Sequence, residues 1–246
     1  MKALFVTGTD TNVGKTYVTT LIARELVAAG INVGVYKPAC SGGVRSPQGE
    51  LHFDDVEKLY DAVAGRFPRE RICPQCFEAA QAPPVAARIE RRTVDWGLLT
   101  SGLDWWKSEV DVLLIEGVGG LLCPLTETRT IADFAQEIAS PLLVVGRLGL
   151  GTINHTLLTV EAAAMRELTV SGIVLSEVED DGGGGGDNAA ARTVPAEIAA
   201  RCEIPMLGVV PYRESRRLLH NGRLITMNWL SLIEKTVVRR GETNAN

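Results

Sequence analysis

The stretch FVTGTDTNVGKTYVTTLIARELVAAG, residues 5–30, joins an apolar run, a loop of Gly and Thr residues, and a helical pattern. Apolar residues recur on one helical face at Val18, Leu21, Ile22, Leu26 and Ala29. Strand, loop, Gly-Lys-Thr and helix are the parts of a phosphate-binding loop, where backbone N–H groups at the helix start attract anionic oxygens. In such a loop Lys15 would contact the outer phosphates and the Thr16 hydroxyl would face Mg²⁺.

One spacing in this stretch departs from the common phosphate-loop pattern. Five residues, 9–13, separate Gly8 from Gly14, where the common pattern has four. The alternative is a strand-to-helix turn that carries Lys and Thr by chance. The coincidence of strand, loop, Gly-Lys-Thr and helix favours the phosphate loop.

Short apolar runs bounded by Gly or polar turns recur along the chain. They are Ala3–Val6, Val33–Tyr36, Val112–Ile115, Leu142–Val145, Ile173–Leu175 and Met206–Val210. Continuous hydrophobicity indicates strands buried on both faces, as in a parallel sheet, and helical patterns at 153–168 and 189–202 lie between them. The pattern predicts a single α/β domain over residues 1–246, of the P-loop NTPase type, with a doubly wound, mostly parallel sheet and helices on both faces. A Gly-rich run, residues 179–188, is interpreted as a flexible surface loop.

Composition limits the classes of partner. The formal net charge is −5, whereas a nucleic-acid-binding protein is expected to present a basic face. The five cysteines form no even framework, which suits a reducing compartment. No apolar run approaches the roughly 18 residues that span a bilayer, and no signal-peptide pattern is present. We expect a cytoplasmic protein without a nucleic-acid or membrane partner.

A second candidate strand carries an acidic residue. Four apolar residues precede Glu116, so we expect its carboxylate at the carboxyl end of a parallel strand, where open α/β sheets place their sites. Gly117, Gly119 and Gly120 leave the backbone open to a ligand. The alternative is a solvated acid in a turn.

Polar residues that follow the strand at 33–36 are expected at the same edge of the sheet. Lys37 and Ser41 lie in the sequence YKPACSGG, directly after that strand. Asp54 and Asp55 begin a predicted helix, whose N-terminus they could stabilise. One of the two could instead complete an oxygen shell for a metal ion together with Glu116 and Thr16.

Three further features are given structural interpretations. Cys73-Pro-Gln-Cys76 is a single CxxC pair, and because zinc needs about four ligands we interpret it as two loop thiols. Trp105 and Trp106 are predicted to pack on the helix before the strand at 112–115. Residues 224–238 predict a terminal helix docked on its own domain, with a membrane-surface helix as the alternative.

Several segments together resemble one family. The sequences VTGTDTNVGKT, YKPACSG, IEGVGGLLCPL, GLGTINHTLLT and IPMLGVVP, with Asp54-Asp55, resemble dethiobiotin synthetase in order from residue 7 to about 211. The five-residue loop spacing is itself a trait of that family. The resemblance implies an ATP- and Mg²⁺-dependent ligase that joins CO₂ to 7,8-diaminononanoate and closes a cyclic urea. It also implies a homodimer whose partners are small molecules, with ATP as co-substrate.

The resemblance also implies roles for individual residues. It assigns catalysis to Lys37, Lys15 and Thr11. It assigns the substrate to Ser41, Thr11 and Asn154, the last across the homodimer interface, and Mg²⁺ to Thr16, Asp54 and Glu116. The nucleotide would contact Asn12, Val13, Gly14, Lys15, Thr16, Tyr17, Asp54, Glu116, Gly117, Val118, Gly119, Ser176, Glu177, Val209, Val210 and Pro211.

Two positions depart from the family pattern. Ser176-Glu177 stands where well-known members carry an Asn-Asp pair against adenine, and Ser lacks the paired donor and acceptor of an amide. Nucleotide choice could therefore be looser than strict ATP. Asn12 stands where some members carry an acid near the substrate amine.

Three other functions are alternatives to the ligase. A partitioning or division-site ATPase switch needs an additional Lys in the phosphate loop, and residues 8–13 contain none. An amide-forming ligase with a glutamine-hydrolysing domain needs more chain after Pro211 than this sequence has. A silent binding protein has no need to keep Lys15, Lys37 and Glu116 together.

Overall fold

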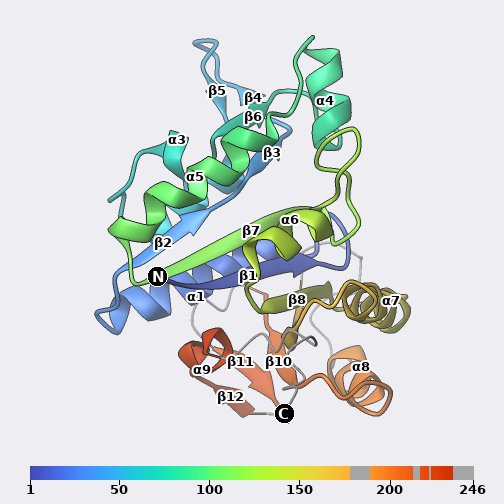
Figure 1. Ribbon diagram of the computed structural model, residues 1–246. Helices are drawn as coiled ribbons and strands as arrows, with labels where there is room; N and C mark the ends of the chain where they lie inside the picture. The colour runs from blue at the N-terminus through green and yellow to red at the C-terminus, as the bar shows by residue number, and fades with distance from the viewer. Residues whose placement is uncertain (178–188, 213–216, 222, 235–246) are drawn as a thin grey trace, which may run out of the picture.

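The computed structural model describes residues 1–177, 189–212, 217–221 and 223–234 (Figure 1). An eight-stranded sheet, with strand order β12-β11-β10-β9-β8-β1-β7-β2, runs through it. Six strands are parallel: β10 (Met206–Val210), β9 (Val170–Ser176), β8 (Leu142–Arg147), β1 (Lys2–Gly8), β7 (Val112–Gly120) and β2 (Val33–Tyr36). Two antiparallel strands continue one edge: β11 (Leu218–His220) and β12 (Arg223–Ile225). The Gly-rich run at 179–188 lies outside the described residues.

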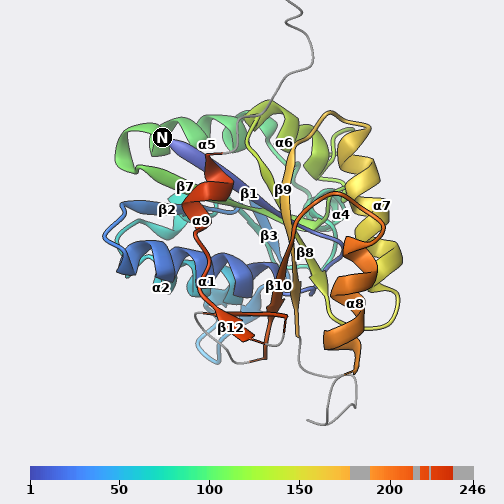
Figure 2. The ribbon, with the colours of Figure 1, turned by 90° about the horizontal axis from the view of Figure 1, so that it is seen from below.

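Helices cover both faces of the sheet, as the views in Figures 1 and 2 show. One face carries α1 (Lys15–Ala28) and α9 (Trp229–Ile233). The other carries α5 (Trp96–Glu109), α6 (Ile131–Ile138), α7 (Thr152–Ala164) and α8 (Ala189–Ala199). The predicted doubly wound α/β fold is therefore confirmed.

A smaller region extends beyond the β2 edge of the sheet (Figure 1). It contains α2 (Asp54–Ala62), α3 (Arg69–Ile72), α4 (Pro83–Ile89) and two small sheets, β3 (Ala39–Ser41) with β6 (Gln75–Phe77) and β4 (Val44–Arg45) with β5 (Leu51–His52). Parallel pairing sets Cys40 opposite Cys76 and Ser41 opposite Phe77. This region carries the chain from Lys37 out of the main sheet and back to β7.

The expected strands all form, because their apolar residues are buried on both faces. The predicted packing role of the tryptophans is confirmed: Trp106 is fully buried and its indole nitrogen donates to the Arg71 carbonyl, while Trp105 stacks edge-on against Trp106. None of the helices in the described ranges has the length and apolar character that a bilayer crossing requires.

The prediction at 224–238 is wrong at its start. Leu224 lies in β12, where the backbone pairs antiparallel with Leu219 of β11 instead of turning into a helix. The helix begins only at Trp229, whose indole nitrogen donates to Glu25 of α1. Residues 235–238 lie outside the described part of the chain.

Candidate active site

The loop between β1 and α1 has the backbone geometry that phosphate binding requires. Helix α1 begins at Lys15, and its N-cap, Gly14, has φ 93°, a left-handed conformation that residues with a Cβ adopt rarely. The loop curls back so that Nζ of Lys15 donates to the Asp10 carbonyl at 2.8 Å. At Gly8 an added Cβ would meet that same carbonyl oxygen at 2.8 Å, so the curled loop leaves room only for glycine. The helix start thus presents backbone donors and a lysine ammonium to one small space.

A lysine ammonium beside this loop is held by two carboxylates. Nζ of Lys37 lies 2.7 Å from Oε1 of Glu116 and 2.5 Å from Oδ2 of Asp55. The hydroxyl of Thr16 donates to the same Oε1 of Glu116 at 2.7 Å. Lys37 and Glu116 are buried, whereas the Asp55 side chain is 39% exposed. Residues from the P-loop, β7, the end of β2 and the start of α2 therefore meet in one network.

The position of Glu116 corrects one expectation. Strand β7 does not end before Glu116 but continues to Gly120, with Glu116 opposite Val6 and Gly120 opposite Gly8 of β1. The pairing with β1 shifts register between Val6 and Gly8, and the glycines after Glu116 fit closely between neighbours there; a Cβ at Gly117 would lie 3.1 Å from Ile131. Glu116 is thus buried within the sheet rather than solvated in a turn, and among the described residues its second carboxylate oxygen, Oε2, has no hydrogen-bond partner.

The adjacent acids at the start of α2 have different surroundings. Asp55 faces the Lys37 network, whereas the Asp54 carboxylate is 78% exposed and pairs with Lys58 at 2.5 Å. The burial pattern of α2 explains the difference, since Asp55 lies four residues before buried Leu59 and Asp54 lies four before exposed Lys58. The resemblance assigned the metal role to Asp54, but the structure brings Asp55 to the network.

The charged groups in this network shift one another's pKa values. Burial and the nearby positive charge of Lys37 lower the pKa of Lys15 to about 8. Burial would also lower the pKa of Lys37, but Glu116 and Asp55 outweigh it and hold that pKa well above its ordinary value. Burial opposes ionisation of Asp55, yet Lys37 and Thr16 keep its pKa below the ordinary value. Near neutral pH the site therefore holds two ammonium groups and at least one carboxylate.

A cavity of about 320 Å³ opens onto the network. Its lining comes from the P-loop, α1, the ends of β2 and β3, α2, and β7: Thr11, Asn12, Gly14, Lys15, Thr16, Tyr17, Lys37, Cys40, Ser41, Asp55, Lys58, Val118 and Gly119. A second cavity, of about 350 Å³, shares Thr11 and is lined by Asp10, Cys123 and the α7 residues His155, Leu158 and Thr159, among others. Thr11 therefore lies between two adjoining spaces. Sequence reasoning had not singled out Cys40, Lys58 or Cys123.

The remaining predicted residues lie away from this cavity. Ser176 and Glu177 lie at the end of β9, where the Glu177 N–H donates to the Val210 carbonyl and the buried Ser176 hydroxyl has no hydrogen-bond partner within the described ranges. Val209 and Pro211 lie beside them at the end of β10. Asn154 is exposed in the first turn of α7 and lines neither cavity.

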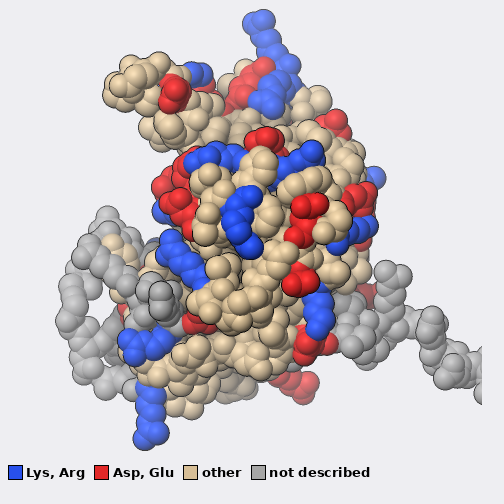
Figure 3. Space-filling view, turned by 90° about the vertical axis from the view of Figure 1, so that its left-hand side faces the viewer, with Lys and Arg blue, Asp and Glu red and all other residues tan. Residues whose placement is uncertain are grey.

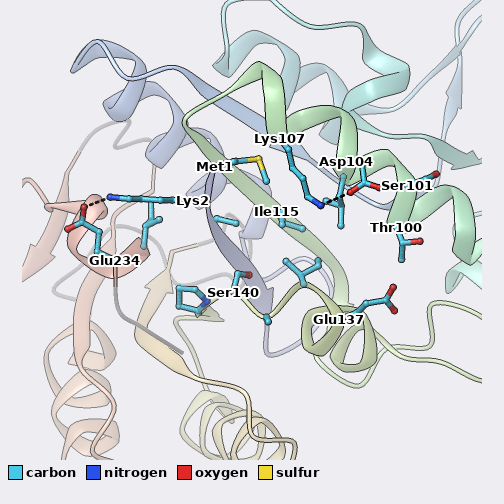
Figure 4. Close-up of a pocket in the computed structure, with 16 residues that line it drawn as sticks. Met1, Lys2, Thr100, Ser101, Asp104, Lys107, Ile115, Glu137, Ser140 and Glu234 are labelled. Carbon is cyan, nitrogen blue, oxygen red and sulfur yellow. Dashed lines mark hydrogen bonds and ion pairs between the residues drawn. The ribbon is translucent and has the colours of Figure 1, made fainter. Parts of the chain in front are cut away.

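A larger cavity, of about 1080 Å³, lies at the opposite end of the strands. Its walls include the start of β1, the C-terminal parts of α5 and α6, and α9, as Figure 4 shows. Four of its charged side chains pair with one another, Lys2 with Glu234 and Lys107 with Asp104, while Glu137 pairs with Arg129 outside the lining. On the face shown in Figure 3, basic and acidic side chains are interspersed rather than gathered by sign. The phosphate-binding features lie at the carboxyl edge of the sheet, so the smaller cavity is the candidate active site.

The phosphate loop, the two lysines Lys15 and Lys37 that line its cavity and the mostly parallel sheet define a P-loop nucleotide-binding protein of the α/β class. Two solved structures share this fold. The first is chloroplast FtsY from Physcomitrella patens, with a TM-score of 0.53 and 14% sequence identity; the match covers 94% of this chain and 64% of the FtsY chain. A ParA family ATPase from Chlorobium tepidum TLS, with a TM-score of 0.50 and 13% identity, covers 87% and 85%. At these identities the likeness concerns the fold alone.

Sequence relatives narrow the class. Residues 2–217 match the family model described as AAA domain. An ATP-dependent dethiobiotin synthetase BioD from Anaeromyxobacter sp. (strain Fw109-5) is 44% identical over 82% of this chain and 89% of its own length. The protein of the same name from Bacillus cereus (strain B4264) is 37% identical over 86% and 84%. The chain belongs to the ATP-dependent dethiobiotin synthetase family, whose members are ligases that form C–N bonds, and this favours the ligase over the ATPase switch.

Proposed function

We propose that this chain joins CO₂ to 7,8-diaminononanoate with ATP and closes the cyclic urea of dethiobiotin, releasing ADP and phosphate. Membership of the dethiobiotin synthetase family supports the overall reaction. The observation that carries the proposal is the buried Lys37 ammonium, held between Asp55 and Glu116 and lining one cavity with the P-loop lysine. Transfer of a phosphoryl group between anions needs cations and backbone donors of this kind.

The proposed chemistry proceeds in three steps. One substrate amine adds CO₂ and loses a proton to become a carbamate. A carbamate oxygen attacks the γ-phosphorus of ATP, ADP leaves, and a mixed carbamic-phosphoric anhydride forms. The second amine then attacks the activated carbon and phosphate leaves, which closes the ring. In these steps Lys15 neutralises the outer phosphates, and Lys37 contacts both the carbamate and the transferring phosphoryl group.

A magnesium ion fits the oxygen groups beside Lys37. Thr16, Asp55 and Glu116 supply a hydroxyl and two carboxylates, and the buried Oε2 of Glu116 finds no hydrogen-bond partner in the described part of the chain. When bound, Mg²⁺ would neutralise the charge that develops on the β- and γ-phosphates. We propose Asp55 as the acidic group from α2, because Asp54 is exposed and paired with Lys58.

Substrate contacts follow from the two adjoining cavities. Ser41 and Thr11 line the space beside Lys37, which suits the carbamate end, and Thr11 also borders the second cavity towards α7. A homodimer, with Asn154 of one subunit reaching the substrate of the other, is supported by exposed apolar side chains near α7. Leu150 is fully exposed, and Met165 and Leu158 are 85% and 56% exposed. These side chains leave apolar surface exposed before, along and after α7, which a second subunit would cover.

The nucleotide base is proposed to lie at the ends of β9 and β10. The buried Ser176 hydroxyl is free to hydrogen-bond with a base, and the backbone of Val209 to Pro211 lies beside it. The Glu177 carboxylate accepts the Tyr212 N–H at 3.0 Å and can accept further donors. Because this pair replaces an Asn-Asp pair, we propose that CTP and GTP also support the reaction.

The experiment that tests the function is ADP release with ATP, Mg²⁺, bicarbonate and 7,8-diaminononanoate, omitting each component in turn. We expect release to require the diamine and CO₂ together. A Lys37→Gln variant should lose about 100-fold or more in kcat while still binding ATP, because the ammonium serves the transition state. Slow release that ignores the diamine would overturn the proposal, and near-normal turnover of Lys37→Gln would remove Lys37 from the mechanism.

A further inference from the structure

Three of the five cysteines gather behind the Lys37 side of the active site. Cys73 lies in the short loop between α3 and β6, as the sequence suggested, whereas Cys76 lies within β6 rather than in a loop. Their Sγ atoms lie 3.5 Å apart. Cys40, which lines the active-site cavity, lies opposite Cys76 in the neighbouring strand β3 (Figure 1). The fold therefore brings the CxxC pair to within reach of bond formation and places it beside the candidate site.

Metal binding does not account for this cluster. Within the described ranges, no group of three or more His, Cys, Asp or Glu side chains is arranged to hold a metal ion. Packing alone does not account for it either. Cys73 is buried, but Cys76 is only partly buried, so part of its surface stays in contact with solvent.

The two thiols differ in the way that thiol–disulfide exchange requires. A hydrogen bond with Cys73 lowers the pKa of Cys76, and the positive charges of Lys37 and Arg92 act in the same direction. Burial raises the pKa of Cys73 well above its ordinary value. Cys76 is thus the more accessible and more readily ionised thiol, suited to attack, and Cys73 is the enclosed neighbour, suited to displace a group from it.

We propose that Cys73 and Cys76 form an exchange site for small-molecule disulfides that closes into an intramolecular disulfide. The Cys76 thiolate attacks one sulfur of the small disulfide, the S–S bond breaks, and one small thiolate leaves. Cys73, after losing its proton to solvent, attacks Cys76 sulfur and displaces the second small thiolate. Two protein thiols are oxidised and one small disulfide is reduced to two thiols, so electrons and atoms balance.

We expect the disulfide to slow turnover, because the segment that carries Cys73 and Cys76 also contacts two residues of the active site. The Lys37 N–H donates to the carbonyl of Ile72 at 2.7 Å, one residue before Cys73. Ser41 lies opposite Phe77, one residue after Cys76. Bond formation shortens the sulfur separation from 3.5 Å to about 2.05 Å, which pulls on both attachments. Displacement by a fraction of an ångström at catalytic groups is costly, so we expect turnover to fall about fivefold or more.

The test treats the full chain with oxidised glutathione, alkylates the remaining thiols, and maps cysteine-containing peptides by mass spectrometry. The expected product is a Cys73–Cys76 disulfide that dithiothreitol reverses. In Cys73→Ser, glutathione should remain on Cys76, because the displacing thiol is missing. Cys76→Ser should carry no glutathione on Cys73. Absence of the intramolecular disulfide in the unmodified chain would overturn the proposal without relying on any variant.

Turnover before and after oxidation tests the coupling, which rests on the proposed function. Oxidised enzyme should lose about fivefold or more and recover with dithiothreitol. The matched control, Cys202→Ser, removes a partly buried cysteine outside the candidate site and should respond as the unmodified chain does. If oxidation still lowered turnover in both Cys73→Ser and Cys76→Ser, the link between the disulfide and turnover would be overturned. If the reduced chain releases no ADP, the proposed function fails, whereas the peptide map still tests the exchange site.

Discussion

Asp55 and Asp54 are adjacent acids with opposite surroundings, so they offer a matched test of the site. We compare Asp55→Asn with Asp54→Asn, each of which removes one negative charge with little change in shape. Asp55 lies 2.5 Å from the Lys37 ammonium, whereas Asp54 is 78% exposed and pairs with Lys58. Only the first substitution should alter the groups that contact ATP.

The size of the effect follows from the exposure of Asp55. Two unit charges about 4 Å apart attract by about 1 kcal/mol in water and about 4 kcal/mol at an effective dielectric constant of 20. With 39% of its side chain exposed, Asp55 lies between these limits, because solvent screens part of the interaction. Since about 1.4 kcal/mol is tenfold, Asp55→Asn should lose about 5- to 1,000-fold in kcat/KM for ATP. Asp54→Asn loses only an exposed ion pair, which contributes little.

The assay is the initial rate of diamine-dependent ADP release over a range of ATP and Mg²⁺ concentrations. Asp55→Asn should also need more Mg²⁺ to reach half its maximal rate, and Asp54→Asn should match the unmodified chain. A circular dichroism melt of both variants is the control for folding. Equal losses in the two variants, or a larger loss in Asp54→Asn, would refute the assignment of the metal carboxylate to Asp55.

Two further predictions concern protonation and packing. Because the pKa of Lys15 is lowered to about 8, ATP affinity should fall as pH rises above that value, and ATP binding there should take up a proton, which calorimetry in two buffers would detect. Lys15→Arg should abolish this pH dependence. A flat pH profile of ATP affinity in the unmodified chain would count against the prediction. Folding favours the neutral Lys15, so its contribution to the free energy of unfolding rises with pH between about 8 and the ordinary 10.5. In Gly34→Ala the new Cβ would lie 2.5 Å from buried Trp106, so urea titration should show a free energy of unfolding that is lower by about 1–3 kcal/mol. The control Gly97→Ala changes an exposed glycine in a helix and should not lower it. Equal stability of the two variants would contradict the close packing at Gly34.

Much of the fold was predictable because its signals are local. Each parallel strand is a continuous apolar run, and α1 shows its buried face in the spacing of Val18, Leu21 and Leu26. The errors arose where tertiary contacts decide. Pairing with β11 draws Leu224 into a strand, and pairing with β1 extends β7 past Glu116. Neither pairing leaves a mark in the adjacent sequence.

Part of the candidate site was likewise predictable from local sequence, and part was set by tertiary packing. The phosphate loop could be recognised from residues 8–16, because its function depends on backbone conformation and neighbouring side chains. The choice between Asp54 and Asp55 depended on the phase of α2 against the core, which is set by packing around Leu59. The four-residue spacing from Asp55 to Leu59 was the available signal.

The sequence by itself determined the P-loop class, the parallel sheet and the family, because these depend on residues that are neighbours in the chain. The tertiary structure decided which groups meet Lys37: Glu116 from within β7, 79 residues away, and Asp55 from α2, 18 residues away. It also decided that Cys40 lies opposite Cys76, next to the CxxC pair. Such meetings depend on how strands and helices pack, and that packing follows from burial of the whole core rather than from any single segment.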